Sequence, residues 1–264
     1  MKKKNYQWNA TDYADHSASQ FEWAGELIDK LALRGNEVLL DIGCGDGKVS
    51  AAIAARLPDG HVLGIDSSGD MTELAARRYP DFPNLSFQTT DVRELDFENR
   101  FDVAFSNAAL HWITDHLSFL PKIKKSLKCS GKILFQMGGR GNAQEILSVL
   151  DNLLEKEEWK PYFYGFRFPY GFYGPEEYEK WLPRVGLNAE RIELIPKDMM
   201  HKGKKELAAW LRTTWLPYTE RLPENLRESF ISDVVDTYAE THPPDKDGVI
   251  HVGMARLEIE AYNI

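Results

Sequence analysis

The stretch VLLDIGCGDGKV, residues 38–49, joins an apolar run, a carboxylate and three alternating glycines within twelve residues. The run that ends at Asp41 is continuously hydrophobic, which is typical of a parallel strand covered on both faces. The three glycines carry no Cβ, so the backbone can turn sharply there and approach a ligand closely. A helix is predicted to follow at once, over about residues 48–57, which makes this segment a strand–loop–helix unit.

The spacing of the glycines distinguishes three kinds of ligand. A phosphate-binding P-loop requires Gly-Lys-Ser/Thr, whereas Val49 follows Lys48 here. A dinucleotide-binding loop favours a small residue where Lys48 stands. The remaining pattern, Asp-x-Gly-x-Gly-x-Gly, resembles motif I of the class I S-adenosylmethionine-dependent methyltransferases. The resemblance implies that Asp41, Gly43 and Gly45 contact the amino acid part of S-adenosylmethionine, which carries no phosphate.

A second short apolar run, residues 61–66, also ends in a carboxylate. It lies about as far downstream as such folds place a ribose-binding acid. Asp66 is therefore the ribose candidate, because a carboxylate can accept hydrogen bonds from two vicinal hydroxyl groups. Ser67 and Met71 follow it and join the expected cofactor contacts.

Two further strands complete the predicted binding edge. Residues 84–88 form the third strand, and the resemblance implies that Asp91 accepts from the adenine amino group while Val92 packs against the ring. Asn107 and Ala108 stand at the carboxyl end of the fourth strand. Ligands of open α/β sheets bind outside such strand ends, so we expect the cofactor at this edge.

Strands and helices alternate up to a fifth strand at residues 131–137, and a last strand is predicted over residues 250–262. This order resembles the class I methyltransferases across nearly the whole chain. The resemblance implies an α/β fold with a doubly wound, mostly parallel seven-stranded Rossmann-like sheet, whose last strand lies antiparallel beside the fifth. An inserted helical cap would favour a small substrate shielded from water. The expected segments are a cofactor-binding core at 1–137, a helix and aromatic loop of the cap at 138–174, a helix and strand returning to the core at 175–200, a helical cap insertion at 201–248 and a final antiparallel core strand at 249–264.

The composition agrees with a cytoplasmic enzyme. A chain of 264 residues with 43% hydrophobic residues can bury a large core. Two cysteines are too few for a disulfide framework and indicate a reducing compartment, and no apolar run approaches the length of a membrane span. The net charge of −9 disfavours a nucleic-acid partner, since phosphate binding normally requires a basic face. We expect no metal site, and the sequence leaves the oligomeric state open.

The segment YADHSASQ, residues 13–20, resembles the Tyr-x-x-x-(Ser/Ala)-x-x-Gln segment of many small-molecule methyltransferases. The resemblance implies that Tyr13 and Gln20 contact the methionine end of the cofactor. The preceding Trp-Asn pair and the stretch SNAALHWITDH at residues 106–116 are similar to the trans-aconitate methyltransferase family. Malonyl-carrier-protein and juvenile-hormone-acid methyltransferases share the Tyr…Gln helix and also form methyl esters, so the identity of the acid stays open.

Methylation of a carboxylate needs few catalytic side chains. The methyl carbon of S-adenosylmethionine is already activated, and an ionised carboxylate can attack it without a general base, so alignment supplies most of the rate. We expect a small carboxylic acid as the substrate, with its other carboxylates held by arginine forks. The candidates are Arg140, which is favoured because it follows the fifth strand directly, then Arg167 and Arg212, with Lys204 as a weaker option.

His111 and Trp112 lie just beyond Asn107, where a substrate would meet the transferred methyl group. Trp112 can wall the site and pack against the sulfonium, or it can belong to the core. His111 can hydrogen-bond a substrate oxygen, or it can act as a base toward a hydroxyl or amine. The alternatives are therefore a small-molecule N-, C- or hydroxyl-O-methyltransferase that uses His111 as its base, and a non-catalytic regulatory protein that binds S-adenosylmethionine.

Overall fold

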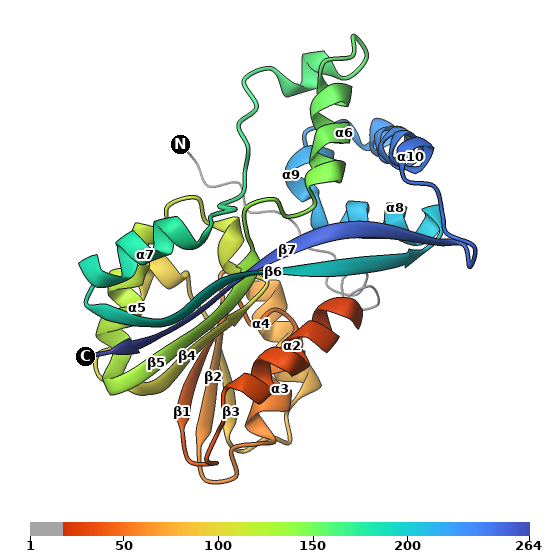
Figure 1. The fold of residues 1–264 in the computed structure, drawn as a ribbon. Coiled ribbons are helices and arrows are strands. Elements are labelled where there is room, and N and C mark those ends of the chain that lie inside the picture. Colours follow the sequence, from red (N-terminus) through yellow and green to blue (C-terminus); the bar gives the residue numbers. More distant parts are fainter. Residues whose placement is uncertain (1–17) are drawn as a thin grey trace. The chain divides into compact units, whose positions relative to one another are not determined.

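The computed structural model describes residues 18–264, with side chains from Trp23 onward. The predicted contact of Tyr13 lies outside the described residues, and so does the side chain of Gln20, although its backbone is part of the first described helix. Within this part of the chain, seven strands form one sheet in the order β3-β2-β1-β4-β5-β7-β6 (Figure 1). The strands are β1 (Val38–Ile42), β2 (His61–Asp66), β3 (Leu85–Thr89), β4 (Phe101–Asn107), β5 (Leu127–Gly138), β6 (Leu187–Lys202) and β7 (Val249–Asn263).

Helices connect most of these strands. The α-helices are α2 (Ala18–Lys30), α3 (Lys48–Ala54), α4 (Gly69–Arg78), α5 (Leu120–Ser126), α6 (Gln144–Leu154), α7 (Pro175–Arg184), α8 (Lys204–Thr214), α9 (Leu216–Thr219) and α10 (Glu224–Thr241). Four short 3-10 helices are η1 (Val92–Glu94), η2 (Leu110–Trp112), η3 (His116–Ser118) and η4 (Lys160–Phe163).

The pairing of the strands confirms the predicted sheet. β1 pairs in parallel with β2 and β4, β2 pairs in parallel with β3, and β4 pairs in parallel with β5. β7 runs antiparallel to β5, with Gly138 opposite Arg256 at one end of the ladder and Lys132 opposite Tyr262 at the other. The last strand therefore lies beside the fifth with the reversed direction that the sequence predicted.

The described chain divides into two compact units. The first, here called the sheet unit, consists of residues 20–140, 170–195 and 256–264. The second, here called the helical unit, consists of residues 141–169 and 196–255, in addition to the backbone of residues 18 and 19. The predicted assignment of core and cap segments stays a prediction.

The sheet unit is covered on both faces. Leu39 of β1 packs in one apolar cluster with α2 and α3, and its neighbour Leu40 packs in the other cluster with α5 and α7. Successive side chains of a strand point to opposite faces, so a strand covered on both sides has to be apolar at every position. This arrangement explains why the stretch before Asp41 is continuously hydrophobic.

The helical unit has an aromatic core of its own. Trp159 is fully buried, its indole N–H donates to Asp233 Oδ2 at 2.9 Å, and its ring meets that of Phe230 edge to face at 5.1 Å. Phe163 stacks on Phe230, with the two ring centroids 5.6 Å apart. These contacts join η4 and the segment after α6 to α10.

β7 is buried on alternate residues in the helical unit and on both faces in the first part of its sheet-unit segment. Ile250, Val252 and Met254 are buried in the helical unit, whereas Leu257 and Ile259 are buried in the sheet unit. Because side chains alternate along a strand, the even and the odd positions face opposite sides. Arg256 therefore lies on the opposite face of the sheet from Leu257, and both side chains are buried.

Candidate active site

The glycine loop between β1 and α3 uses its three glycines in different ways. At Gly43 (φ +74°) an added Cβ would lie 2.2 Å from the Cβ of Ala109, and at Gly47 (φ +81°) it would lie 2.7 Å from the ring of Phe87. At Gly45 (φ +53°) an added Cβ would meet no atom within 4 Å. Gly43 and Gly47 are therefore required by packing within the protein, and Gly45 is the glycine of the loop that borders open space.

Asp66, at the end of β2, lies against this loop. Its carboxylate accepts hydrogen bonds from the backbone N–H of Gly45 at 3.0 Å and of Ser68 at 2.9 Å. Burial raises the pKa of Asp66, although hydrogen bonds from Ser68, Gly45 and Ser67 oppose that shift. Met71 is buried one turn into α4, which Ser68 caps by accepting from the Met71 N–H at 3.4 Å. The fold thus brings the predicted residues of the second strand end to the edge of the loop.

Asp41 is held inside the protein. It is 2% exposed, and its carboxyl accepts from the Ser50 hydroxyl in the first turn of α3 at 2.5 Å. Burial raises its pKa to about 7, and the nearby charge of Asp66 acts in the same direction against the Ser50 hydrogen bond. In this structure Asp41 therefore ties the end of β1 to the start of the helix behind the glycine loop.

The third strand end carries a different arrangement. Asp91 caps η1 by accepting from the backbone N–H of Arg93 at 2.9 Å, and its two oxygens also accept from the Arg93 guanidinium at 2.8 and 2.5 Å. Val92 beside it is 6% exposed. A backbone-capped, arginine-bound carboxylate is fixed in direction, so Asp91 presents a rigid acceptor next to an apolar side chain.

The end of β4 presents a polar atom that has no partner. Among the described residues, no group hydrogen-bonds the buried Oδ1 of Asn107. The next residue, Ala108, adopts a left-handed conformation (φ +55°), and its N–H donates to Gln136 O at 2.8 Å. A buried acceptor without a partner costs free energy unless a ligand or water supplies a donor. Asn107 and the open side of Gly45 therefore fit a bound nucleoside with hydroxyl and ammonium donors.

An aromatic cluster, defined here as His111, Trp112, Tyr170 and Phe172, follows the end of β4. Tyr170 and Phe172 are stacked with ring centroids 5.1 Å apart, and Trp112 meets Tyr170 edge to face at 5.1 Å. His111 lies 5.7 Å from Phe172 and 6.1 Å from Tyr170. The backbone N–H of Gly171 donates to His111 O at 2.8 Å, which fastens the segment 170–172 to η2.

His111 is a buried imidazole whose hydrogen bond determines which ring nitrogen carries the proton. Its Nδ1 accepts a hydrogen bond from the backbone N–H of Gly138 at 3.4 Å. A nitrogen that accepts cannot carry the proton, so the neutral ring carries it on Nε2. Burial lowers the pKa of His111 to about 3, and the charges of Arg256 and His116 contribute to the shift. The ring is therefore a hydrogen-bond donor near neutral pH and too weak a base to take a proton.

Arg140, which the sequence favoured as the substrate clamp, is engaged elsewhere. Its guanidinium donates to Glu177 at 2.6 and 2.8 Å and to Glu176 at 3.0 Å, at the start of α7. Its side chain is half exposed, and its N–H donates to Tyr173 O at 2.9 Å. The structure thus uses Arg140 to fasten the end of β5 to α7 through ion pairs with two glutamates.

Sequence reasoning did not single out Arg256. It is 4% exposed, stands opposite Gly138 in the β5–β7 ladder, and its guanidinium carbon lies 5.6 Å from the ring centroid of Trp23 in α2. Its charge also acts on His111. The position becomes visible only from the register of two strands more than a hundred residues apart. The one local sign of it in the sequence is that the apolar residues of β7 shift from even positions, up to Met254, to odd positions, from Leu257 onward.

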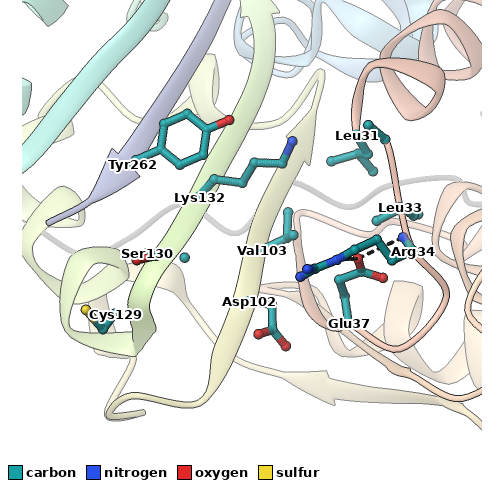
Figure 2. A pocket seen from close by; sticks show the side chains of 12 residues that line it. Leu31, Leu33, Arg34, Glu37, Asp102, Val103, Cys129, Ser130, Lys132 and Tyr262 are labelled. Atoms are coloured by element: carbon teal, nitrogen blue, oxygen red, sulfur yellow. Dashed lines mark hydrogen bonds and ion pairs between the residues drawn. The ribbon is translucent and has the colours of Figure 1, made fainter.

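A cavity of about 310 Å³ lies in the sheet unit at the opposite, amino-terminal edge of β1, β4 and β5 (Figure 2). The carboxylates that line this cavity already accept hydrogen bonds from groups within the protein. Glu37 accepts from the backbone N–H groups of Arg34 and Gly35, and Asp102 accepts from the Val38 N–H and from Lys128 Nζ at 2.8 Å. Ligands of open α/β sheets bind at the carboxyl ends of the strands, so we do not place the active site in this cavity.

Within residues 18–264, no helix is long and apolar enough to cross a membrane. Over the same range, no group of three or more His, Cys, Asp or Glu side chains is arranged to hold a metal ion.

Comparison with known proteins agrees with this geometry. Residues 39–131 match a family described as a methyltransferase domain. The chain is 28% identical to the trans-aconitate 2-methyltransferase of Methylobacterium nodulans, covering 96% of this chain and 97% of that one. It is also 28% identical to the enzyme of the same name from Enterobacter sp. strain 638, covering 95% and 96%. Among solved structures, a phosphoethanolamine N-methyltransferase of Haemonchus contortus with S-adenosyl-L-methionine has a similar fold, with a TM-score of 0.61, 19% identity and coverage of 96% and 56%.

The sheet order, the loop after β1 and these relatives define the chain as a class I S-adenosylmethionine-dependent methyltransferase. Within that class it resembles the trans-aconitate 2-methyltransferases over nearly the full length of the chain. Its cofactor is S-adenosylmethionine, as the sequence predicted.

Proposed function

We propose that this methyltransferase acts on a small molecule and methylates a carboxylate oxygen to give a methyl ester. The observation that carries the proposal is the state of His111, which is a neutral donor and not a base at the end of β4. The relatives named trans-aconitate 2-methyltransferase support an acid as the acceptor.

The chemistry follows from the protonation states. S-adenosylmethionine supplies, when bound, a methyl group on a positively charged sulfur. In the proposed transfer, an oxygen lone pair of the substrate carboxylate would form the new C–O bond as the C–S bond breaks, and the electron pair of the broken C–S bond would neutralise the sulfur. No proton moves, because a carboxylate is already ionised at neutral pH. An amine or a phenol would need a base that a histidine of pKa about 3 does not provide.

The residues around the site have separate parts in this proposal. Gly45, Asp66, Asp91 and Asn107 would hold the cofactor, with Ser67, Met71, Val92 and Ala108 beside them. His111 would donate its Nε2–H to the substrate carboxylate, and Trp112 would shield the reacting atoms from water. Exclusion of water strengthens such a hydrogen bond and raises the reactivity of the carboxylate.

The direct test is transfer of a radiolabelled methyl group to a panel of pure compounds. The panel contains trans-aconitate, citrate, itaconate and octanoate as acids, with an amine and a phenol of similar size. We expect label that is volatile after mild alkali, the behaviour of a methyl ester, from at least one acid. Alkali-stable label on the amine or the phenol, with none on the acids, would contradict the proposal.

A further inference from the structure

Gln136 of β5 has a buried side-chain oxygen that no other group uses within the part of the chain that the structure describes. The residue is 1% exposed, and its amide N–H donates to Glu258 Oε2 at 3.1 Å across the β5–β7 ladder. The oxygen Oε1 at the other side of the amide receives no hydrogen bond in return. A buried acceptor without a donor costs free energy, so this oxygen requires a ligand or a water molecule.

The contact with Glu258 fixes the direction in which the amide of Gln136 points. Although burial raises the pKa of Glu258, its hydrogen-bond donors and the charge of Arg191 hold that pKa below the ordinary 4.5. The carboxylate is therefore ionised at neutral pH and can only accept. The NH2 group of Gln136 has to face it, so Oε1 has to face the other way. Donation to a carboxylate also polarises the amide, which makes its oxygen a stronger acceptor.

A second acceptor of the same kind lies on the neighbouring strand. Asn107 of β4 is in register with Gln136, and its buried Oδ1 likewise has no donor among residues 18–264. Phe105 and Leu134, two residues earlier on each strand, pack on the face of the sheet that α2 covers. Side chains on one face repeat every second residue, so Asn107 and Gln136 point to that face as well. Adjacent strands lie about 4.8 Å apart, so a single group with several N–H bonds can reach both oxygens.

The two acceptors lie beside the part of the site where the amino acid end of the cofactor is expected. An added Cβ at Gly43 would lie 2.2 Å from the Cβ of Ala109, so the glycine loop adjoins the end of β4. Asp66, the ribose candidate, ends β2, which lies on the other side of β1 from β4 and β5 (Figure 1). S-adenosylmethionine bound with its ribose at Asp66 would therefore extend its methionine part towards Asn107 and Gln136.

We propose that Gln136 and Asn107 form an acceptor pair that binds the ammonium group of S-adenosylmethionine. The ammonium is the one group of the cofactor that combines a positive charge with several N–H bonds, so two side-chain oxygens can share it. The sulfonium has no N–H or O–H bond, and the ribose hydroxyls and the adenine amino group are neutral. This assignment depends on the cofactor, which the class of protein defines, and not on which small molecule accepts the methyl group.

The experiment compares two ligands by calorimetry with the cofactor-free protein. One is S-adenosylhomocysteine, which carries the ammonium, and the other is its deamino analogue, which carries hydrogen in that place. Gln136→Met keeps the volume of the side chain and removes the oxygen. We expect it to weaken binding of S-adenosylhomocysteine by about 20-fold, the usual effect of losing a hydrogen bond to a charged group, and to leave the Kd of the deamino analogue unchanged. Asn107→Ala, at a partly exposed residue, should show the same difference between the two ligands.

Lys30→Met is the matched control, because it removes a different partner of Glu258, whose carboxylate accepts from Lys30 Nζ at 2.7 Å. We expect it to lower thermal stability and to leave the affinities for both ligands unchanged. If Gln136→Met binds both ligands as the wild type does, or loses both equally, the assignment is wrong.

The wild type provides a check that needs no variant. It should bind the deamino analogue at least about 20-fold more weakly than S-adenosylhomocysteine, and equal binding of the two ligands would also overturn the assignment. Transfer of methyl groups to the panel of acids tests the proposed function separately, since neither ligand in these titrations carries a methyl group to transfer.

Discussion

Asp66 shows how one side chain connects loop geometry to cofactor binding. Its carboxylate is oriented by the N–H groups of Gly45 and Ser68, and two hydroxyl groups of a ribose can share its remaining acceptor sites. We expect Asp66→Ala to weaken binding of S-adenosylmethionine at least 30-fold, measured by calorimetry. Asp66→Asn keeps one acceptor and should lose less. Equal affinity in all three proteins would exclude Asp66 from the cofactor site.

The raised pKa of Asp41 leads to a separate prediction about how the stability of the protein depends on pH. Its pKa in the folded protein is about 7, against an ordinary value of 3.8, so the folded state holds a proton that the unfolded state releases over this range. The free energy of unfolding should therefore fall as pH rises from about 4 to 7, by up to roughly 4 kcal/mol from this group. Asp41→Asn keeps an acceptor for Ser50 and cannot ionise.

Urea unfolding of the cofactor-free protein between pH 4 and 8 checks this effect. The difference in stability between Asp41→Asn and wild type should grow in favour of the variant as pH rises, and it should level off above pH 7. A constant difference across the range would mean that Asp41 keeps an ordinary pKa.

At the scale of elements, the glycine loop allows a paired test. Gly43→Ala places a Cβ 2.2 Å from Ala109 at a left-handed φ, so it should cost about 3 kcal/mol of stability. Gly45→Ala meets no atom and should cost about 1 kcal/mol from its φ alone. Gly45→Ala should instead weaken cofactor binding, because it fills the open side of the loop. Chemical denaturation and calorimetry of both variants separate the two effects, and the reverse pattern would refute this division of roles.

Two prolines lie at positions where a helix or a strand can accommodate them. Residues 116–126 form two short helices, η3 and then α5, with Pro121 in the first turn of the second. Proline lacks an N–H and favours a helix start. β6 extends from Leu187 to Lys202 and includes Pro196. β6 is an edge strand, where a proline does not remove a hydrogen bond that a neighbour needs.

At the scale of the whole molecule, one buried acid joins three elements of the sheet unit. Glu258 of β7 is fully buried and binds Lys30 of α2, Gln136 of β5 and Arg191 at the start of β6. Although burial raises its pKa, these partners hold it below the usual 4.5. A lowered carboxyl pKa means that the stabilisation is present above pH 4.5 and is lost as pH falls through the folded value.

Glu258→Gln should therefore lower the free energy of unfolding by about 3 kcal/mol at pH 7, because it leaves two cations beside a neutral amide. The loss should shrink at pH 4, where wild-type Glu258 begins to take up a proton. Urea denaturation at both pH values measures it. A variant as stable as wild type at pH 7 would show that the network contributes no net stability.

The sequence by itself determined the parallel strands, the glycine loop and the identity of the cofactor, because these depend on short-range patterns of apolar residues, glycines and strand-end acids. Asp66, Asn107 and the segment around His111 were predicted as site residues in the same way, since each follows directly from its own strand. Only the tertiary structure decided which arginine is buried near His111, because the register of β7 on β5 sets Arg256 opposite Gly138. It also decided that Arg140 is paired with Glu176 and Glu177, because ion pairs between distant segments leave no periodic trace in the sequence.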